Sequence, residues 1–489
     1  MLNDEYQTRL QKLKKIAEQG INPFPDKFDK THSISDALTS RLGAKVKTAG
    51  RILTLRDMGK ISFGHIQDAS GKIQIVLKQD EIGKEEFKSF LKIFDPGDFI
   101  GVEGEIFKTQ KGEISILVKT FVMLAKALRP LPEKWHGIKD QELKYRQRYL
   151  DLISDKTTYD RFVFRSNFIR ALREFYWQEG FIELETPILT NTASGALAKP
   201  FKTHHNALDI DVYLRIAPET YLKEAVVGGF EKVFELGRLF RNEGIDPSHL
   251  QDYTSVEHYV AYWNYEDNMR FTEKLFGTLL KKLFGTTTVT IKDRTGQAVK
   301  VDFKPPFKTV SFRDLILKDS GIDIDACKTV TELRTQIKKK KIALENVENL
   351  GRGNLIDALY KEVSRPKIIQ PTFVINHPVD VSPLARRNDQ NPAIVDRFQL
   401  VINTWEVVNA YSELVDPVDQ KNRFETQAKA KAQGDDEAHG KDDDFVRALE
   451  HGAPPMSGWG MGVDRLITLL SQQDNLRDVV LFPLLRPEK

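Results

Sequence analysis

Residues 234–259 read FELGRLFRNEGIDPSHLQDYTSVEHY, which predicts a strand, a polar loop and a second strand. Side chains alternate along a strand, so four polar residues share one face of the second strand: Tyr253, Ser255, Glu257 and Tyr259. A face with one carboxylate and two phenols is unusual for a core and suits a bound cationic group. The alternative is a surface hairpin held together by salt bridges.

The loop between these strands carries ionisable side chains, namely Arg238, Arg241, Glu243 and His249. An arginine at the end of a strand can bind a phosphate or a carboxylate through two parallel hydrogen bonds. The loop is therefore a candidate for binding an anionic group beside the polar strand face.

Residues 457–470 read SGWGMGVDRLITLL and predict a glycine-rich turn that leads into a helix near Val463. Arg465 lies in the first helical turn, where the positive end of the helix dipole disfavours a cation. An arginine in this position is explained if a phosphate or another anion is bound nearby. The alternative is a glycine-rich turn before a buried helix.

Residues 404–417 read TWEVVNAYSELVDP and contain two candidate ligands for a hard cation such as Mg²⁺, Glu406 and Glu413. The β-branched residues between them favour a strand, and residues seven apart in a regular strand face opposite ways. Both glutamates reach one site only if the strand bends or bulges near Asn409-Ala410. The alternative is two unrelated surface carboxylates.

The N-terminal part of the chain has a hydrophobic period of two, which is typical of short strands. The predicted strands are 45–55, 60–67, 72–78, 99–107 and 113–124. Five strands in about 80 residues suggest a small closed barrel of the OB-fold kind. A β-sandwich is the alternative.

Beyond residue 129 the pattern mixes helices with strands, including a helix over 159–179 and a strand over 181–185. We therefore predict an α+β protein of several parts. These are an N-terminal helix and connector (1–43), the barrel (44–128), a linker (129–143) and a larger domain (144–489) with a helical insertion at about 310–365.

Composition narrows the class of protein. The 489 residues carry 73 Lys+Arg and 70 Asp+Glu, for a formal charge of +3, so bulk charge does not attract nucleic acid and any such contact must be local. The single cysteine, Cys327, excludes an intrachain disulfide and a multi-cysteine zinc site. We expect no secretory signal and no membrane-spanning segment.

Taken in order, these segments resemble the three motifs of class II aminoacyl-tRNA synthetases. The helix and strand before Pro187 resemble the first motif, Phe240-Arg241-Asn242-Glu243 resembles the second, and Gly458 to Arg465 resembles the third. Segments such as KYRQRYLDL (144–152) and VSPLARRND (381–389) make nearly the whole chain similar to the lysyl-tRNA synthetases. The resemblance implies a five-stranded OB-fold barrel followed by a catalytic domain built on an antiparallel sheet flanked by helices.

The resemblance also implies a lysine–tRNA ligase, which activates L-lysine with ATP to lysyl-adenylate and transfers lysine to the 3′ end of tRNA(Lys). It implies Mg²⁺ as a cofactor, a homodimer joined through the first motif, and a cytoplasmic location, with no membrane or DNA partner. An aspartate- or asparagine-specific enzyme is the nearest alternative, which Glu257 and Glu413 disfavour. A catalytically silent tRNA-binding paralogue is another. An enzyme that ligates lysine to a protein fits poorly, because such relatives lack the barrel.

Residue roles follow from the resemblance position by position. Arg241 would contact the α-phosphate and the amino-acid carboxylate, and Arg465 the γ-phosphate. The implied ATP site is Arg241, Glu243, His249, Tyr253, Glu406 and Arg465, of which Arg241, Glu243 and Arg465 are the implied catalytic residues, and Glu406 and Glu413 are the implied Mg²⁺ ligands. The implied lysine site is Gly195, Glu219, Arg241, Glu257, Tyr259, Asn409, Tyr411 and Glu413.

In the barrel, the resemblance implies anticodon binding by Arg56, Phe63 and Gln74. An unstacked base can lie on an aromatic ring while an amide reads its edge. Ile66 has the opposite parity to Phe63 and is the better candidate for the barrel core. One departure from the family stands after His249, where the chain reads Leu250-Gln251-Asp252 instead of the usual Asn-Pro-Glu.

Overall fold

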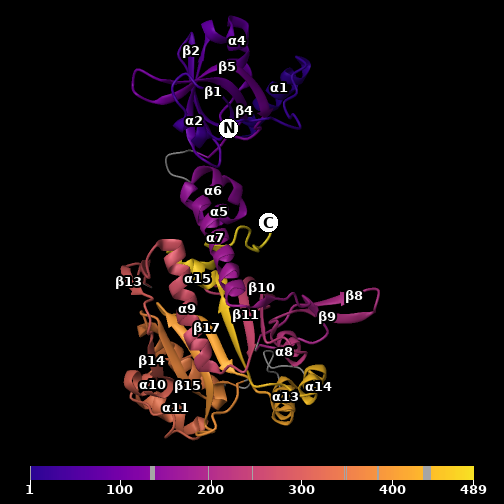
Figure 1. Cartoon of the computed structure of the whole chain (residues 1–489), viewed down its shortest axis with the longest axis vertical. Coiled ribbons are helices and arrows are strands. Elements are labelled where there is room, and N and C mark those ends of the chain that lie inside the picture. Colours follow the sequence, from indigo (N-terminus) through magenta and orange to yellow (C-terminus); the bar gives the residue numbers. More distant parts are fainter. Residues whose placement is uncertain are drawn as a thin grey trace. The chain divides into compact units, whose positions relative to one another are not determined.

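The computed structural model describes residues 2–132, 138–196, 198–244, 246–293, 295–345, 347–348, 350–382, 385–432 and 442–488. Residues 133–137 of the predicted linker lie outside these ranges. The chain forms two compact units, Met1–Asp140 with Tyr149–Ser154, and Gln141–Arg148 with Asp155–Lys489. Each unit is described by itself, with the elements labelled in Figure 1.

The first unit contains a closed barrel with the strand order β1-β2-β3-β5-β4. Its strands are β1 (Lys45–Asp57), β2 (Ile61–Gln67), β3 (Lys72–Lys78), β4 (Phe99–Lys108) and β5 (Ile114–Ala125). All five predicted strands are present, and the closure excludes the sandwich. Burial alternates along β2, so Ile66 faces the core and Phe63 points outward, as its parity predicted.

Short helices pack around this barrel: α1 (Leu2–Glu18), α2 (Ile34–Thr39), α3 (Gln79–Ile82) and α4 (Lys84–Ile93). Sequence reasoning missed α4, which buries Phe87, Phe90 and Ile93 against the barrel core. Helix α1, which was predicted, is tied to the barrel through Arg9, whose guanidinium donates to the carbonyl oxygens of Pro96 and Ala127.

The second unit is built on an eight-stranded sheet in the order β14-β15-β16-β17-β18-β11-β10-β6. The strands are β14 (Lys308–Ser311), β15 (Thr372–Pro378), β16 (Ile394–Ile402), β17 (Trp405–Ser412), β18 (Met456–Gly462), β11 (Asp252–Ala261), β10 (Lys232–Phe240) and β6 (Ile182–Glu183). The outermost pairs, β14–β15 and β10–β6, are parallel and the other pairs are antiparallel. The strand predicted over 181–185 is β6, which is only two residues long.

One face of the sheet is covered by α7 (Lys156–Gln178), α9 (Tyr265–Phe284) and α15 (Val463–Leu470). Their apolar side chains pack with those of the central strands, including Val256, Trp459 and Met461, in the largest core. The helix predicted over 159–179 is α7, which begins three residues earlier, after Asp155 caps its first turn.

The opposite face carries α8 (Glu219–Val227), whose Leu222 and Val226 pack against Tyr259 of β11 and Met456 of β18. Residues around 310–365 contain α10 (Phe312–Ser320), α11 (Val330–Lys339) and α12 (Arg352–Val363), with their own apolar core. Helix α6 (Arg148–Ser154) belongs to the first unit except for its first residue. The remaining helices and strands of the second unit are α5 (Gln141–Arg146), α13 (Pro417–Ala432), α14 (Asp443–Glu450), β7 (Leu189–Thr190), β8 (Lys202–His205), β9 (Ile210–Leu214), β12 (Thr288–Lys292) and β13 (Ala298–Asp302). Among the described residues, no helix combines the length and the apolar character that crossing a bilayer requires.

Candidate active site

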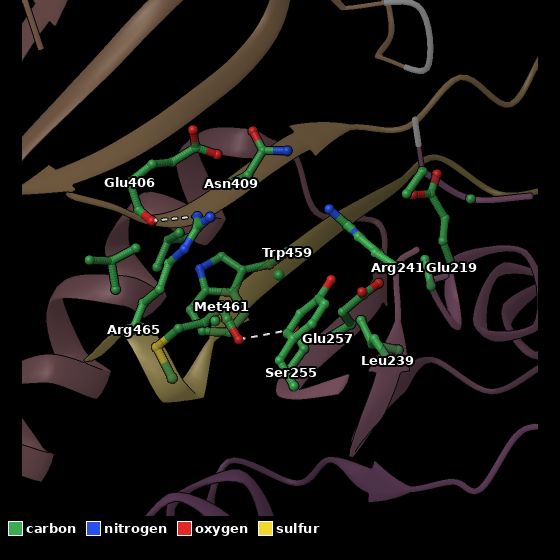
Figure 2. A pocket seen from close by; sticks show the side chains of 18 of the residues that line it. Glu219, Leu239, Arg241, Ser255, Glu257, Glu406, Asn409, Trp459, Met461 and Arg465 are labelled. Carbon is green, nitrogen blue, oxygen red and sulfur yellow. Dashed lines mark hydrogen bonds between the residues drawn. The ribbon is translucent and has the colours of Figure 1, made fainter. Parts of the chain in front are cut away.

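A cavity of about 390 Å³ lies against the centre of the large sheet. Figure 2 shows Arg465 on the Glu406 side of this cavity, and Arg241, Glu219 and Glu257 together on the other side. The cavity brings together nearly all the residues predicted for the larger domain: Gly195, Glu219, Arg241, Glu243, His249, Tyr253, Glu257, Tyr259, Glu406, Asn409, Tyr411 and Arg465. Glu413 is the predicted residue that is not in its lining.

Strand β11 supplies the polar floor of the cavity. Its lining residues include Tyr253, Ser255, Glu257 and Tyr259, the four side chains that alternation placed on one face. His258, on the other face, is fully buried, and its Nε2 lies 2.8 Å from Asn268 Oδ1. Burial lowers the pKa of His258 to about 3, so this imidazole is a neutral core group that faces away from the cavity.

Strand β17 brings Glu406 to the cavity through a bulge. Leu400 of β16 pairs with Val408, but the next residue of β16, Val401, pairs with Glu406, so Val407 is the extra residue. A bulge shifts the alternation by one residue and puts Glu406 on the side of Asn409. A bend was required by the sequence near Asn409-Ala410, and the structure places it at Val407.

Two arginines approach the cavity from different elements. Arg241 follows β10, and its backbone N–H donates to the Gln251 carbonyl oxygen at 2.9 Å. Its guanidinium lies 5.5 Å from the ring centre of Tyr253, and its buried Nε has no hydrogen-bond partner among the described residues. Burial opposes the charge, but Tyr253, Glu243 and other acidic neighbours raise the pKa of Arg241, so the guanidinium remains a cation that can bind an anion.

Arg465 lies in the first turn of α15, and its Nη1 donates to the backbone carbonyl oxygen of Glu406 at 3.2 Å. The preceding residue fixes this helix: Asp464 accepts a hydrogen bond from the Thr254 backbone N–H at 2.8 Å and forms an ion pair with Arg165 of α7. The turn that presents Arg465 is therefore anchored to both β11 and α7.

Carboxylates gather at the other end of the cavity. Tyr411 donates to Glu219 Oε2 at 3.0 Å, and Tyr259 donates to Glu257 Oε2 at 3.4 Å. The pKa of Glu257 is raised to about 8, mainly because the side chain is buried and also because the Glu219 carboxylate is nearby. The positive charge of Arg241 acts in the opposite direction. This end is therefore acidic and partly desolvated, which suits an ammonium group.

Lys223 pairs with the carboxylates of this acidic cluster and was not predicted as a site residue from the sequence. Its Nζ lies 2.6 Å from Glu219 Oε1 and forms an ion pair with Glu413. Glu219 and Lys223 stand four residues apart on α8, so a search for i,i+4 pairs would have found the first contact. The second contact joins segments far apart in the sequence.

Two glycines, Gly458 and Gly195, leave the space that the side chains of Glu413 and Glu219 occupy. A Cβ atom at Gly458 of β18 would overlap the Glu413 carboxylate and the Tyr259 ring. Gly195 has a φ of +89°, and a Cβ atom there would lie 3.0 Å from the Cβ of Glu219. A side chain at either position would displace a predicted lysine-binding residue.

The barrel carries the second group of predicted residues. Arg56 on β1 and Phe63 on β2 are cross-strand partners, and both point outward. The Gln74 amide donates to Glu113 Oε2 at 2.9 Å. His65, two residues after Phe63, lies 3.0 Å from Glu113 Oε1 through its Nε2, so these two residues join the surface that the sequence predicted.

A Mg²⁺ site requires oxygen ligands, and the two predicted ligands, Glu406 and Glu413, differ in their surroundings. The Glu413 carboxylate is ion-paired with Lys223, whereas the Glu406 carboxylate makes no ion pair within the described part of the chain. The same residues contain no group of three His, Cys, Asp or Glu side chains that could hold a metal ion. The Glu406 carboxylate is therefore available to a metal ion, whereas Glu413 shares its carboxylate with Lys223.

The sequence was compared with known protein families and proteins, and two family models match the two parts of the chain that carry these sites. Residues 140–486 match the family model of class II tRNA synthetases (D, K and N), and residues 46–124 match that of the OB-fold nucleic acid binding domain. The lysine–tRNA ligase of Carboxydothermus hydrogenoformans is 47% identical, over 99% of each chain. That of Thermosipho africanus is 46% identical, over 100% of this chain and 97% of its own. That of Aquifex aeolicus is 49% identical, over 91% of this chain and 73% of its own.

Proposed function

This chain belongs to the lysine–tRNA ligases, a family of class II tRNA synthetases, and from this membership we propose the reaction and the residues that perform it. The enzyme activates lysine with ATP to lysyl-adenylate and transfers lysine to the 3′ end of tRNA(Lys). The observation that carries this function is one cavity with Arg241 and Arg465 among its lining residues and an acidic end at Glu219 and Glu257.

In the first step, a carboxylate oxygen of lysine attacks the α-phosphorus of ATP, the bond to the bridging oxygen breaks, and pyrophosphate leaves. Arg241 contacts the α-phosphate and the amino-acid carboxylate, and Arg465 holds the γ-phosphate. Tyr253 stacks on the adenine, while Glu243 and His249 border the ATP. No protein nucleophile is required, because catalysis consists of positioning and of charge stabilisation by the guanidinium groups.

The acidic end of the cavity receives the substrate's ammonium groups. Gly195 and Glu219 bind the α-ammonium, and the side-chain ammonium is received by residues of β11 and β17 and by the residue after β17: Glu257, Tyr259, Asn409, Tyr411 and Glu413. A buried ammonium requires a carboxylate partner, since an unpaired charge is costly in a desolvated site. An enzyme specific for aspartate would need cations here, which disfavours that alternative.

Mg²⁺ is the cofactor proposed for the ATP step, and Glu406 is its candidate protein ligand. Mg²⁺ is commonly bound through one or two carboxylates together with phosphate oxygens and water, so a single glutamate suffices. When bound, the ion would neutralise phosphate charge in the transition state. Glu413 stays the second proposed ligand through its Oε1, since the ion pair with Lys223 involves Oε2.

The barrel is proposed to bind the anticodon of tRNA(Lys). Phe63 offers its ring to an unstacked base, Gln74 reads the edge of a base, and Arg56 contacts the backbone or a base beside them. The match of residues 46–124 to an OB-fold nucleic acid binding domain supports this assignment.

A homodimer in the cytoplasm is proposed as the working form. Four large apolar side chains on α7 and in the segment that follows it are exposed: Trp177, Ile182, Ile188 and Leu189, at 54%, 49%, 47% and 49%. Clusters of exposed apolar side chains mark interaction surfaces, and Trp177 and Ile182 belong to the segment before Pro187 that resembles the dimer-forming first motif.

The decisive test is amino-acid-dependent exchange between ATP and labelled pyrophosphate. We expect exchange with lysine and none with aspartate or asparagine, followed by charging of tRNA(Lys) in the presence of tRNA. Exchange with aspartate or asparagine instead would identify the alternative specificity. Binding of tRNA without any exchange would identify a silent paralogue.

A further inference from the structure

Lys223 is a buried cation inside the acidic end of the cavity. Its side chain is 2% exposed, and its Nζ is shared between Glu219 on the same helix and Glu413 after β17, whose side chain is 0% exposed. Despite burial, which disfavours its charge, these two carboxylates raise the pKa of Lys223 above its ordinary value. The side chain therefore remains an ammonium ion inside the protein.

This ammonium contacts the same groups that are proposed to receive the substrate. Its Nζ lies 5.8 Å from the ring centre of Tyr259 and 6.0 Å from that of Tyr411, and both tyrosines line the cavity. Tyr411 also donates to Glu219, so α8 and β17 are joined through both a hydrogen bond and a shared cation. The ring of Phe445 on α14 covers Lys223 at 5.7 Å.

The charges of the cavity explain why an internal cation is needed. Lysine brings two ammonium groups and one carboxylate, and Arg241 pairs with the carboxylate. Glu219 and Glu257 line the acidic end, and the buried Glu413 carboxyl group lies next to it, close enough to interact electrostatically with both. Two ammonium groups would leave one of the three unpaired, and an unpaired buried carboxylate is costly. In the lysine complex, where the bound ammonium groups favour the ionised form of the buried carboxyl groups, Lys223 brings the number of cations to three, one for each carboxylate.

We propose that Lys223 is a positioning residue for lysine binding, which neutralises one of these three carboxylates and holds Glu219 and Glu413 toward the two ammonium groups of the substrate. The inference rests on the proposed function and extends it to the charge that selects a diamino acid. Lys223 acts through the carboxylates and makes no contact with the reacting atoms.

A set of four variants tests this charge balance: Lys223→Met, Glu413→Gln, the double variant, and Lys232→Met as the control. Lys232 is another partly buried lysine, packed on Phe181 and Trp263 outside the cavity. The measurements are kcat and the KM values for lysine and for ATP in ATP–pyrophosphate exchange, with the melting temperature of each variant.

We expect Lys223→Met to raise the KM for lysine by about tenfold or more while the KM for ATP changes by less than about twofold. The double variant should bind lysine better than either single variant, because it removes one cation and one anion together. Lys232→Met should resemble the wild type. A merely structural role would instead give losses that multiply in the double variant, and that result would overturn the proposal.

If Lys223→Met does not fold, the charge balance is tested by comparing Glu413→Gln with the double variant. Adding Lys223→Met to Glu413→Gln must lower the KM for lysine, and an equal or higher KM rejects the charge balance. These outcomes are distinct from failure of the proposed function, which would show as no lysine-dependent exchange in the wild type itself.

Discussion

Arg465 donates a hydrogen bond from its Nη1 to the backbone carbonyl oxygen of Glu406 at 3.2 Å, and so ties the first turn of α15 to the bulged strand β17. The side chains of two residues that are 59 positions apart, a guanidinium and a carboxylate, thus reach one cavity. The bulge at Val407 makes this possible, because it turns Glu406 toward the cavity.

Replacing Arg465 with alanine should impair the use of ATP. The change removes a cation proposed to hold the γ-phosphate, and loss of one such group costs about 10²–10³ in kcat. The check is exchange kinetics at varied ATP. Arg270→Ala is the matched control, because Arg270 is an exposed arginine on α9 that pairs with Asp267. Equal kinetics for both variants would remove Arg465 from the site.

Replacing Glu257 with glutamine should weaken the use of lysine. The amide keeps the shape but cannot pair with an ammonium, and leaving one buried charge unpaired costs about 2–5 kcal/mol. The loss should appear in kcat/KM for lysine with little change in the KM for ATP. An unchanged kcat/KM would mean that Glu257 lies outside the lysine pocket.

The pH dependence of lysine binding should follow the same carboxylate. Since the pKa of Glu257 is raised to about 8, the group is largely protonated at neutral pH and must lose its proton to pair with an ammonium. The KM for lysine should therefore fall as pH rises toward 8, by up to about tenfold per unit, and level off above it. In Glu257→Gln this fall should be reduced. A KM that rises over the same range would contradict the assignment.

Adding one methyl group at Gly458 should abolish lysine activation. The new Cβ would overlap Glu413 and Tyr259, and overpacking of this kind costs about 1–3 kcal/mol of stability. Gly277→Ala on α9 is the control, because its Cβ has nothing within 4 Å. The melting temperature measures the loss of stability, and the exchange rate of the folded variant measures the loss of lysine activation. Full activity of Gly458→Ala would show that the pocket tolerates movement of Glu413.

Replacing Phe63 with alanine should lower charging of tRNA(Lys) but leave exchange intact. Loss of one stacked base costs about 1–3 kcal/mol. Val122→Ala on β5 is a suitable control, since Val122 is an exposed barrel residue outside the predicted surface. Loss of exchange together with charging would indicate that Phe63 is structural.

Much of this arrangement could be predicted from local patterns. Alternation alone placed Glu257 and Tyr259 on one face of β11, and the five barrel strands followed from a period of two. Helix α4 was not predicted, although Phe87, Phe90 and Ile93 stand three residues apart, which favours one face of a helix. The bend in β17 was required by the positions of Glu406 and Glu413, but its place at Val407 depends on pairing with β16.

The sequence by itself determined the family, the barrel and the order of the motifs, because each depends on residues that are close together in the chain. Only the tertiary structure decided which carboxylates are free. Lys223 and Glu413 stand 190 residues apart, and their ion pair exists because α8 packs against the strands that carry Tyr259 and Met456. No local pattern reports that pairing, because the two residues are close only in the folded chain.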